Sequence, residues 1–265
     1  MTDLLVATDA GLVVVDVPDD LSGDVPEPGA EVVHTTAVRD VAVTAVPTPD
    51  ATGLAVATDE DVLLASSGAV GALAPTGFGP ATAVSFDGDH LVAGGPDGRV
   101  ARLADGGDWQ PLGALPGAPR AIDAALVATE DGVFRLVGDG LRYAGLEAAT
   151  DVAHAAGVPL AATAAGCYEL GNGWMDVLSG EGRLVAGSSD GRALAATVDR
   201  AVERVDGVWR PVDWPEPACE TPVAAAAFGD RPYVVTGAGD LLVGRDDGWR
   251  VLPLGLEGVR AVVAP

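Results

Sequence analysis

The sequence predicts an all-β fold, a single seven-bladed β-propeller with four antiparallel strands in each blade. Three observations in the 265 residues support this prediction. A hairpin pattern recurs seven times, and the copies are spaced by the length of a four-stranded unit. The N-terminal hairpin lacks a first strand, and a first-strand pattern without a hairpin stands at the C-terminal end of the sequence. Repeats of this period are typical of rings and solenoids built from one supersecondary unit.

The repeated pattern is that of a β-hairpin. Three small or medium apolar residues precede a Thr or Gly, a short acidic or glycine turn follows, and an alternating apolar run comes next, as in LVATDAGLVVVD from Leu5 and LVATEDGVFRL from Leu126. Such a pattern predicts two strands joined by a tight turn. The Thr or Gly serves as a marker, found at Thr8, Thr58, Gly94, Thr129, Thr163, Thr197 and Thr236.

The spacing of the markers predicts the ring. Successive markers lie 50, 36, 35, 34, 34 and 39 residues apart, and 37 residues lead from Thr236 through the two termini to Thr8. A period near this value with short strands indicates a propeller. The long first interval contains residues 17–30, whose prolines and glycines disfavour a strand. We therefore expect one domain, residues 1–265, with blades at 258–264 plus 1–36, 37–75, 80–113, 118–144, 148–177, 181–213 and 221–254.

The outermost strand of several blades begins near a tryptophan that follows a glycine-containing turn. These residues are Trp109, Trp174, Trp209 and Trp249. A large ring that recurs at one repeat position is expected to pack between neighbouring blades.

A first-strand pattern precedes most hairpins. Six copies begin at Val38, Ala81, Pro119, Ala149, Pro222 and Val259. The last copy has no hairpin after it, and the N-terminal hairpin has no first strand before it. We expect the strand at the C-terminus to pair beside residues 4–8 and close the ring, because closure removes a sheet edge that would otherwise promote aggregation.

This closure resembles that of the WD-repeat propellers, and the resemblance covers essentially the whole chain. It is a resemblance of architecture, because the sequence has no Gly-His and Trp-Asp dipeptides of WD repeats, no kelch double glycine and no sialidase Asp-box. The chain is similar to propellers of a haloarchaeal type, a resemblance that implies no particular activity.

Charge is the strongest feature of the composition. The chain has 39 acidic and 15 basic residues, a net charge of −24, and every basic residue is Arg. The acidic residues are spread along the chain, unlike a disordered acidic tail, and this composition resembles the acidic, lysine-poor surfaces of extreme halophiles. Generic nucleic-acid binding needs a basic face, so we expect no nucleic-acid partner.

The acidic surface predicts a dependence of stability on salt. We expect the melting temperature to fall as salt is lowered from molar to about 0.1 M, because the screening length grows from about 3 Å to about 10 Å and the carboxylates then repel one another. Thermal unfolding followed by circular dichroism in KCl measures this, with sucrose as an uncharged control that leaves screening unchanged. Equal melting temperatures at both salt levels would contradict the halophile interpretation.

Other features of the chain bear on its compartment. The N-terminus has no basic region before its apolar residues and is interrupted by Asp9, unlike a secretory signal. No apolar run approaches the roughly 20 residues of a membrane span. Cys167 and Cys219 are too few for a disulfide framework. We expect a cytoplasmic protein with no membrane partner.

The first strands carry the candidate ligand site. Their alignment places Arg39, Arg120 and Arg260 at one repeat position, with Thr82 and Thr150 there in two other blades. Innermost strands line the channel of a propeller, so these residues are expected around one mouth. The planar donor fork of Arg suits carboxylates and other anions.

A structural role is the alternative for the three arginines. Each would then form an ion pair with a nearby acid of the first strands and stiffen the ring, the candidates being Asp40, Asp123 and Asp151. His154, at the end of its first strand, is also expected to reach the channel.

The hairpin turns are expected to form an acidic rim on the same face. The rim residues are Asp9, Asp59, Asp61, Asp97, Asp131, Asp199 and Asp240. Such a rim would suit a basic protein surface, although hairpin turns favour Asp for backbone reasons alone. No segment has the ligand spacing of an EF-hand or a zinc site, so we expect no metal and no cofactor.

No catalytic motif is apparent. The chain has no Gly-x-Ser-x-Gly elbow, no P-loop and no dinucleotide fingerprint, and the absence of Lys excludes Schiff-base chemistry. The sequence therefore predicts a non-catalytic platform or scaffold that binds another protein, in an oligomeric state left open. The alternative is a small-anion binder or hydrolase-type enzyme with its site at the channel mouth.

Overall fold

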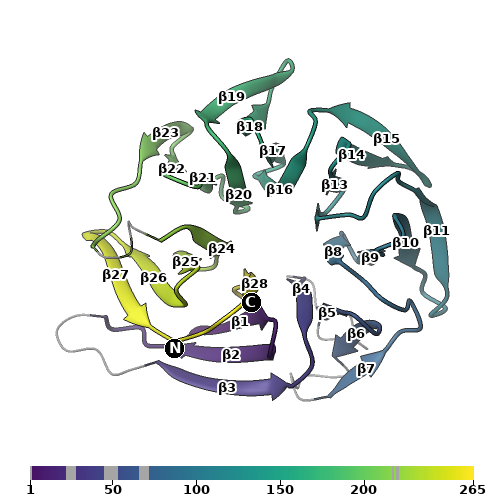
Figure 1. Cartoon of the computed structure of the whole chain (residues 1–265), viewed down its shortest axis with the longest axis horizontal. Helices are drawn as coiled ribbons and strands as arrows, with labels where there is room; N and C mark the ends of the chain where they lie inside the picture. Colours follow the sequence, from purple (N-terminus) through teal and green to yellow (C-terminus); the bar gives the residue numbers. More distant parts are fainter. Residues whose placement is uncertain (1, 22–27, 45–52, 66–71, 217, 219–220) are drawn as a thin grey trace.

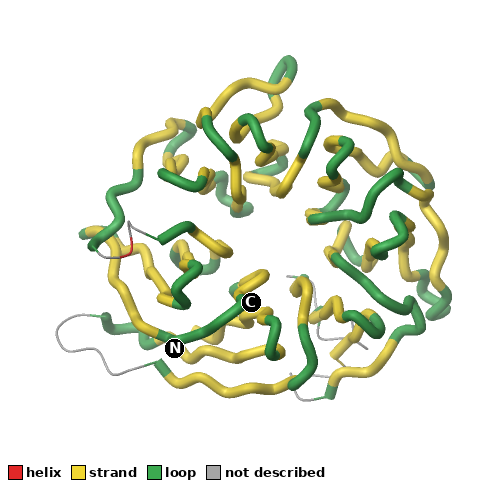
Figure 2. The backbone as a smooth tube through the Cα atoms, viewed as in Figure 1, coloured by secondary structure: helices red, strands yellow, loops and turns green. Residues whose placement is uncertain are grey.

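The structure is a computed structural model that describes residues 2–21, 28–44, 53–65, 72–216, 218 and 221–265. It confirms the predicted architecture: seven four-stranded antiparallel sheets surround a central channel (Figure 1). Figure 2 shows the strands of each blade stacked outward from the centre and joined by turns and loops. Among the described residues, no helix has the length and hydropathy needed to cross a membrane.

The blades are numbered along the chain, and their strands are given from the channel outward. Blade 1 contains β28 (Val259–Val263), β1 (Thr2–Thr8), β2 (Gly11–Val17) and β3 (Gly29–His34). Blade 2 contains β4 (Val38–Val43), β5 (Leu54–Thr58), β6 (Val62–Ala65) and β7 (Leu73–Pro75). Blade 3 contains β8 (Ala83–Asp87), β9 (His90–Gly94), β10 (Arg99–Leu103) and β11 (Trp109–Ala114).

The other four blades follow the same order. Blade 4 contains β12 (Ala121–Asp123), β13 (Leu126–Thr129), β14 (Gly132–Val137) and β15 (Gly140–Gly145). Blade 5 contains β16 (Ala149–Ala155), β17 (Val158–Thr163), β18 (Gly166–Leu170) and β19 (Trp174–Ser179). Blade 6 contains β20 (Gly182–Gly187), β21 (Ala193–Thr197), β22 (Ala201–Val205) and β23 (Val208–Pro211). Blade 7 contains β24 (Val223–Phe228), β25 (Pro232–Thr236), β26 (Asp240–Arg245) and β27 (Gly248–Pro253).

The C-terminal strand closes the ring as predicted. β28 pairs antiparallel with β1, with Val262 opposite Val6 and Val263 opposite Leu5. Val262 is 5% exposed and belongs to the buried cluster that joins blade 1 to blade 7 through Tyr233. The innermost strand of blade 1 therefore comes from the far end of the chain.

The hydrophobic core lies between neighbouring blades. One buried cluster joins Ala55 of blade 2 to Leu91 of blade 3, and another joins Leu160 of blade 5 to Ala195 of blade 6. Small side chains dominate these contacts because the sheets approach one another closely near the channel. The low aromatic content of 5% is compatible with this packing.

The marker threonines stabilise the hairpin turns. Thr8, Thr129 and Thr163 are buried, and each hydroxyl donates a hydrogen bond to the carbonyl oxygen three residues later. The hydroxyl oxygen of Thr163 also accepts from the backbone N–H of Ala165 at 3.0 Å and of Gly166 at 3.3 Å. A single buried hydroxyl therefore satisfies three backbone groups of the turn.

Removal of one such hydroxyl should destabilise the protein. We expect Thr163→Val to lower the unfolding free energy by about 1–3 kcal/mol, because valine keeps the shape but leaves buried backbone groups without partners. Chemical denaturation at molar salt measures the change. Thr35→Val, at an exposed loop position, is the matched control and should change stability by less than about 0.5 kcal/mol. Equal stabilities of the two variants would contradict this role.

The tryptophans lie between blades. The indole N–H of Trp109 donates to the Thr76 carbonyl at 3.2 Å, and that of Trp174 donates to the Ala144 carbonyl at 2.8 Å. In both cases the acceptor belongs to the preceding blade or the loop that leaves it. Trp209 donates to the Glu169 carboxylate of blade 5 at 2.9 Å. These rings therefore connect adjacent blades near the outer edge.

Candidate functional site: the channel and its mouth

A β-bulge aims one residue of most first strands at the channel mouth. The pairing of the first and second strands skips one residue in five blades. A bulge of this kind re-aims a side chain. The residues skipped are Arg39, Thr150, Arg183, Ala224 and Arg260.

Thr82 and Arg120 hold the equivalent position in blades 3 and 4, where they immediately precede the first strands β8 and β12. Their backbone N–H groups bond to the Gly94 and Ala128 carbonyls of the second strands. Six of the seven equivalent residues line the cavity described below; Thr82 does not.

The channel forms a cavity of about 540 Å³. Arginines line its mouth, and Asp40, Asp123, Asp151 and His154 line its interior together with small apolar residues of the first strands. The cavity therefore has arginines at its mouth and carboxyl groups in its interior.

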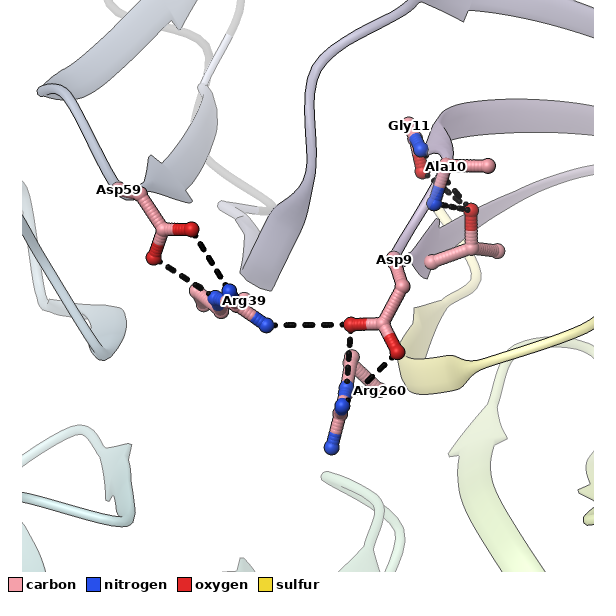
Figure 3. Close-up of polar contacts among 7 residues, drawn as sticks. Asp9, Ala10, Gly11, Arg39, Asp59 and Arg260 are labelled. Carbon is pink, nitrogen blue, oxygen red and sulfur yellow. Dashed lines mark hydrogen bonds and ion pairs between the residues drawn. The ribbon is translucent and has the colours of Figure 1, made fainter.

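Two arginines of the mouth take part in a chain of ion pairs (Figure 3). Arg39 binds Asp59 through two hydrogen bonds of 2.8 and 2.6 Å and reaches Asp9 at 3.1 Å. Arg260 binds the same Asp9 through two hydrogen bonds of 2.9 and 2.8 Å. The chain connects blades 1 and 2 across the site of ring closure.

These ion pairs shift the titration of the two carboxyl groups. The hydrogen bonds from Arg260 hold the pKa of Asp9 below its usual value, and those from Arg39 do the same for the pKa of Asp59. The partners of Arg39 and Arg260 are rim aspartates from the hairpin turns. They are not the acids of the first strands with which a structural role predicts that these arginines pair. Arg39 forms no hydrogen bond with the adjacent Asp40, because Asp40 has other partners.

The remaining predicted mouth residues contact the next blade. Thr82 donates to the Pro119 carbonyl at 2.7 Å, and Thr150 donates to the Gly182 carbonyl at 3.1 Å. Arg120 donates to the Ala149 carbonyl at 3.3 Å and lies 3.3 Å from the Glu130 carboxylate. Each side chain therefore holds the start of the following blade, and the side chain of Arg120 is 40% exposed.

The residues of the predicted rim differ in whether their side chains have partners within the protein. Asp61 turns toward the backbone and accepts from the N–H groups of Val62 and Gly79 at 2.7 and 3.1 Å. Asp97 pairs with Arg99 at 2.8 Å, and this hydrogen bond lowers its pKa. Three rim side chains form no hydrogen bond or ion pair within the described part of the chain, those of Asp131, Asp199 and Asp240.

Asp40 and Asp151 connect successive blades inside the channel. Asp40 accepts from the N–H of Val84 in blade 3 at 3.0 Å, and Asp151 accepts from the N–H of Val185 in blade 6 at 3.0 Å. Each also accepts from the N–H that follows it in the chain, Val41 or Val152, at 2.9 Å. The two carboxyl groups therefore occupy equivalent bridging positions three blades apart.

Desolvation raises the pKa of both bridging groups to about 7. These side chains are only partly buried by surface area, because they face the channel, but protein atoms surround them closely enough to desolvate the carboxyl groups. The backbone hydrogen bonds lower each pKa in part. Repulsion from Asp151 and then Asp123 raises the pKa of Asp40 further, and repulsion from Asp123 raises that of Asp151. Both groups are therefore poised to change charge near neutral pH.

His154 reaches the channel, as expected, where its Nδ1 lies 2.9 Å from the Asp123 carboxylate. No group of three or more His, Cys, Asp or Glu side chains within the described residues is arranged to hold a metal ion. Cys167 is buried, and this burial raises the pKa of its thiol to about 12. Cys219 lies outside the described residues.

Sequence reasoning missed Arg183. It lies at the bulge of β20, between the cross-strand pairs Gly182–Thr197 and Leu184–Ala196, and lines the cavity together with the predicted residues. The segment Gly182-Arg183-Leu184-Val185 matches Val38-Arg39-Asp40-Val41 once the bulge is known. The signal that could have revealed this strand is the Arg at its second position. The glycine before it hides the pattern, because the other copies begin with an apolar residue or a proline.

Solved structures resemble this ring in fold at low sequence identity. The WD40 propeller domain of Doa1 matches with a TM-score of 0.65 and 15% identity, over 98% of this chain and 90% of that one. YCF48 bound to D1 peptide matches with a TM-score of 0.59 and 16% identity, over 81% of each chain. Virginiamycin B lyase from Staphylococcus aureus matches with a TM-score of 0.60 and 9% identity, over 83% of this chain and 85% of that one.

These likenesses include an enzyme as well as a peptide complex, so they establish the fold alone. No curated protein sequence matches the chain. One family model, however, matches it from residue 1 to residue 265. The chain therefore belongs to the HVO_0234-like beta-propeller family.

Proposed function

We propose that this protein is a non-catalytic interaction platform that binds a protein partner over its channel face. The channel face is the face that carries the mouth arginines and the hairpin turns with Asp9 and Asp59. The observation that carries the proposal is the ion-pair chain of Asp59, Arg39, Asp9 and Arg260, which holds charged side chains in fixed positions around an open cavity.

A surface with fixed side chains favours association. Ordering a flexible side chain at an interface costs about 0.5–1.5 kcal/mol, and a pre-organised side chain avoids much of that cost. Three rim aspartates have no side-chain partner among the residues that the structure describes, and they remain available to a basic group of the bound protein: Asp131, Asp199 and Asp240. The structure of YCF48 with D1 peptide supports the proposal by analogy, since that propeller is bound to a peptide.

The test compares the two faces of the ring. Tagged protein would be used to capture partners from a native lysate at molar salt, with the wild type beside two triple variants of equal charge change. The channel-face variant replaces Asp131, Asp199 and Asp240 by Arg. The opposite-face variant replaces three other aspartates by Arg: Asp89, Asp105 and Asp206. These residues are exposed and lie in turns at the other end of the strands.

We expect one protein to be captured in a stoichiometric amount by the wild type and by the opposite-face variant. The channel-face variant should retain at least tenfold less of it. Equal capture by both variants, or no stoichiometric partner with any of the three proteins, would overturn the proposal. Matching melting temperatures of the two variants would show that both are folded.

A further inference from the structure

The arginines around the mouth differ in how they are paired. In blades 1 and 2 the two arginines, Arg39 and Arg260, are matched by two carboxylates, Asp9 and Asp59. In blades 4 to 6 the mouth carries Arg120 and Arg183. In the described part of the chain the one carboxylate within ion-pair distance of either is that of Glu130, which lies 3.3 Å from Arg120 with its side chain 79% exposed. One guanidinium in this half of the mouth, that of Arg183, is therefore left without an ion-pair partner among the described residues.

Arg183 differs from the other mouth arginines in its contacts. Its guanidinium forms no hydrogen bond or ion pair with any residue that the structure describes, and it is exposed at the edge of the cavity. Three other described arginines without such a contact lie on outer strands of their blades and line no part of this cavity. They are Arg135, Arg142 and Arg210.

The backbone at Arg183 is held in place. The Thr150 hydroxyl donates to the carbonyl of Gly182, the residue before Arg183, and Asp151 accepts from the N–H of Val185 two residues after it. Blade 5 therefore fixes both ends of the bulge that presents Arg183. The guanidinium therefore extends from a fixed backbone, and an anion can bind it without first displacing a partner among the described residues.

We propose that Arg183, together with Arg120, binds a carboxylate group at the channel mouth. This inference rests on the proposed function, because it names the chemical group that a partner would insert there. A guanidinium binds a carboxylate through two parallel N–H···O bonds, and such charge-assisted bonds are stronger than neutral ones.

The interior of the channel favours a carboxylate over a more highly charged anion. Asp40, Asp123 and Asp151 line the cavity below the mouth and repel a doubly charged phosphate more strongly than a singly charged carboxylate. They also oppose deeper entry, so the carboxylate is held at the level of the arginines. The group can come from the C-terminus of a protein or from a free carboxylic acid.

The test measures binding to the full chain at molar KCl. The probe is a fluorescein-labelled pentapeptide with uncharged side chains and a free C-terminal carboxylate, and its affinity is followed by fluorescence anisotropy. The same peptide with an amidated C-terminus controls for contacts of the label and the chain. Two variants are compared, Arg183→Gln at the mouth and Arg210→Gln on the outer strand of the same blade.

We expect the free-carboxylate peptide to bind the wild type at least tenfold more tightly than the amidated peptide. Arg183→Gln should lose at least tenfold of that affinity, and Arg210→Gln should stay within twofold of the wild type. Displacement of the peptide by acetate at millimolar concentration would identify a free acid as a sufficient ligand. Resistance to acetate would identify the peptide C-terminus as the source.

Two results would overturn the inference: equal affinity of the wild type for the free and amidated peptides, or equal affinity of the wild type and Arg183→Gln for the free peptide. Neither result depends on the capture experiment. A partner captured through the channel face by a protein that fails the peptide test would leave the proposed function intact and remove this inference alone.

Discussion

Replacing Val262 by Asp is expected to destabilise the whole ring by about 4 kcal/mol or more. The Val262 side chain is 5% exposed and packs in the cluster that contains Leu4, Val6 and Tyr233. An aspartate there buries a charge without a partner and disturbs the strand that closes the propeller. For a chain of this size we expect the melting temperature at molar salt to fall by roughly 10 °C.

Val208 provides the matched control for this substitution. It lies on β23 with 52% of its surface exposed, so Val208→Asp should shift the melting temperature by no more than a degree or two. Size-exclusion chromatography of both variants would add a second readout, because an opened ring exposes a strand edge that promotes association. Similar melting temperatures for the two variants would show that closure through β28 contributes little to stability.

The unfolding free energy is expected to decrease as pH rises from about 4 to about 7. In the folded protein the pKa of Asp40 and that of Asp151 are raised to about 7, whereas an unfolded aspartate titrates near 4. Between these values the folded state binds more protons than the unfolded state, so stability falls with pH and levels off above about 7. Water in the channel weakens the effect, and we expect a loss on the order of 2 kcal/mol from the two groups together.

The double variant Asp40→Asn with Asp151→Asn isolates this effect. Asparagine carries no charge to desolvate, so chemical denaturation at molar salt should show a much flatter dependence between pH 5 and pH 8. Each asparagine also loses one of two acceptor oxygens, so the variant should be less stable than the wild type at pH 5 and closer to it at pH 8. Asp131→Asn, at an exposed turn, should leave the slope unchanged. An unaltered slope in the double variant would refute the assignment.

Other carboxyl groups act in the opposite direction at lower pH. Arg260 and Arg39 lower the pKa of Asp9 and Asp59, so these ion pairs contribute stability above about pH 4 that is lost as pH falls through the lowered values. The two opposing dependences place the greatest stability in mildly acidic solution.

The fold could be predicted from the sequence because its determinants are local and repeated. The marker threonines recur at one place in each hairpin, and the buried hydroxyl of Thr163 explains why that residue type suits the turn. The closing strand was recognised because a first-strand pattern at Val259 had no hairpin of its own. Neither inference required knowledge of a contact between distant segments.

The candidate site could be predicted only in part because its contacts are made between blades. The mouth position was found from the alignment of Arg39, Arg120 and Arg260, but Arg260 pairs with Asp9, which lies 251 positions away in the chain. The role of Asp40 was also hidden, since its acceptor contact with the Val84 N–H depends on how two neighbouring blades meet beside the channel. Side-chain direction at a bulge is set by strand pairing, which the residue pattern around Arg183 does not reveal.

The pairing of β28 with β1 has a consequence for the synthesis of the protein. Leu5 lies opposite Val263, so the first hairpin leaves the ribosome long before its partner strand exists. At about 5–20 residues per second, the translation of the intervening chain takes on the order of 10–50 s. During that time the inner edge of β1 offers unpaired backbone groups to any neighbouring nascent chain. A chaperone that covers this edge, or rapid engagement of the other blades, would protect the growing polypeptide until its final strand arrives.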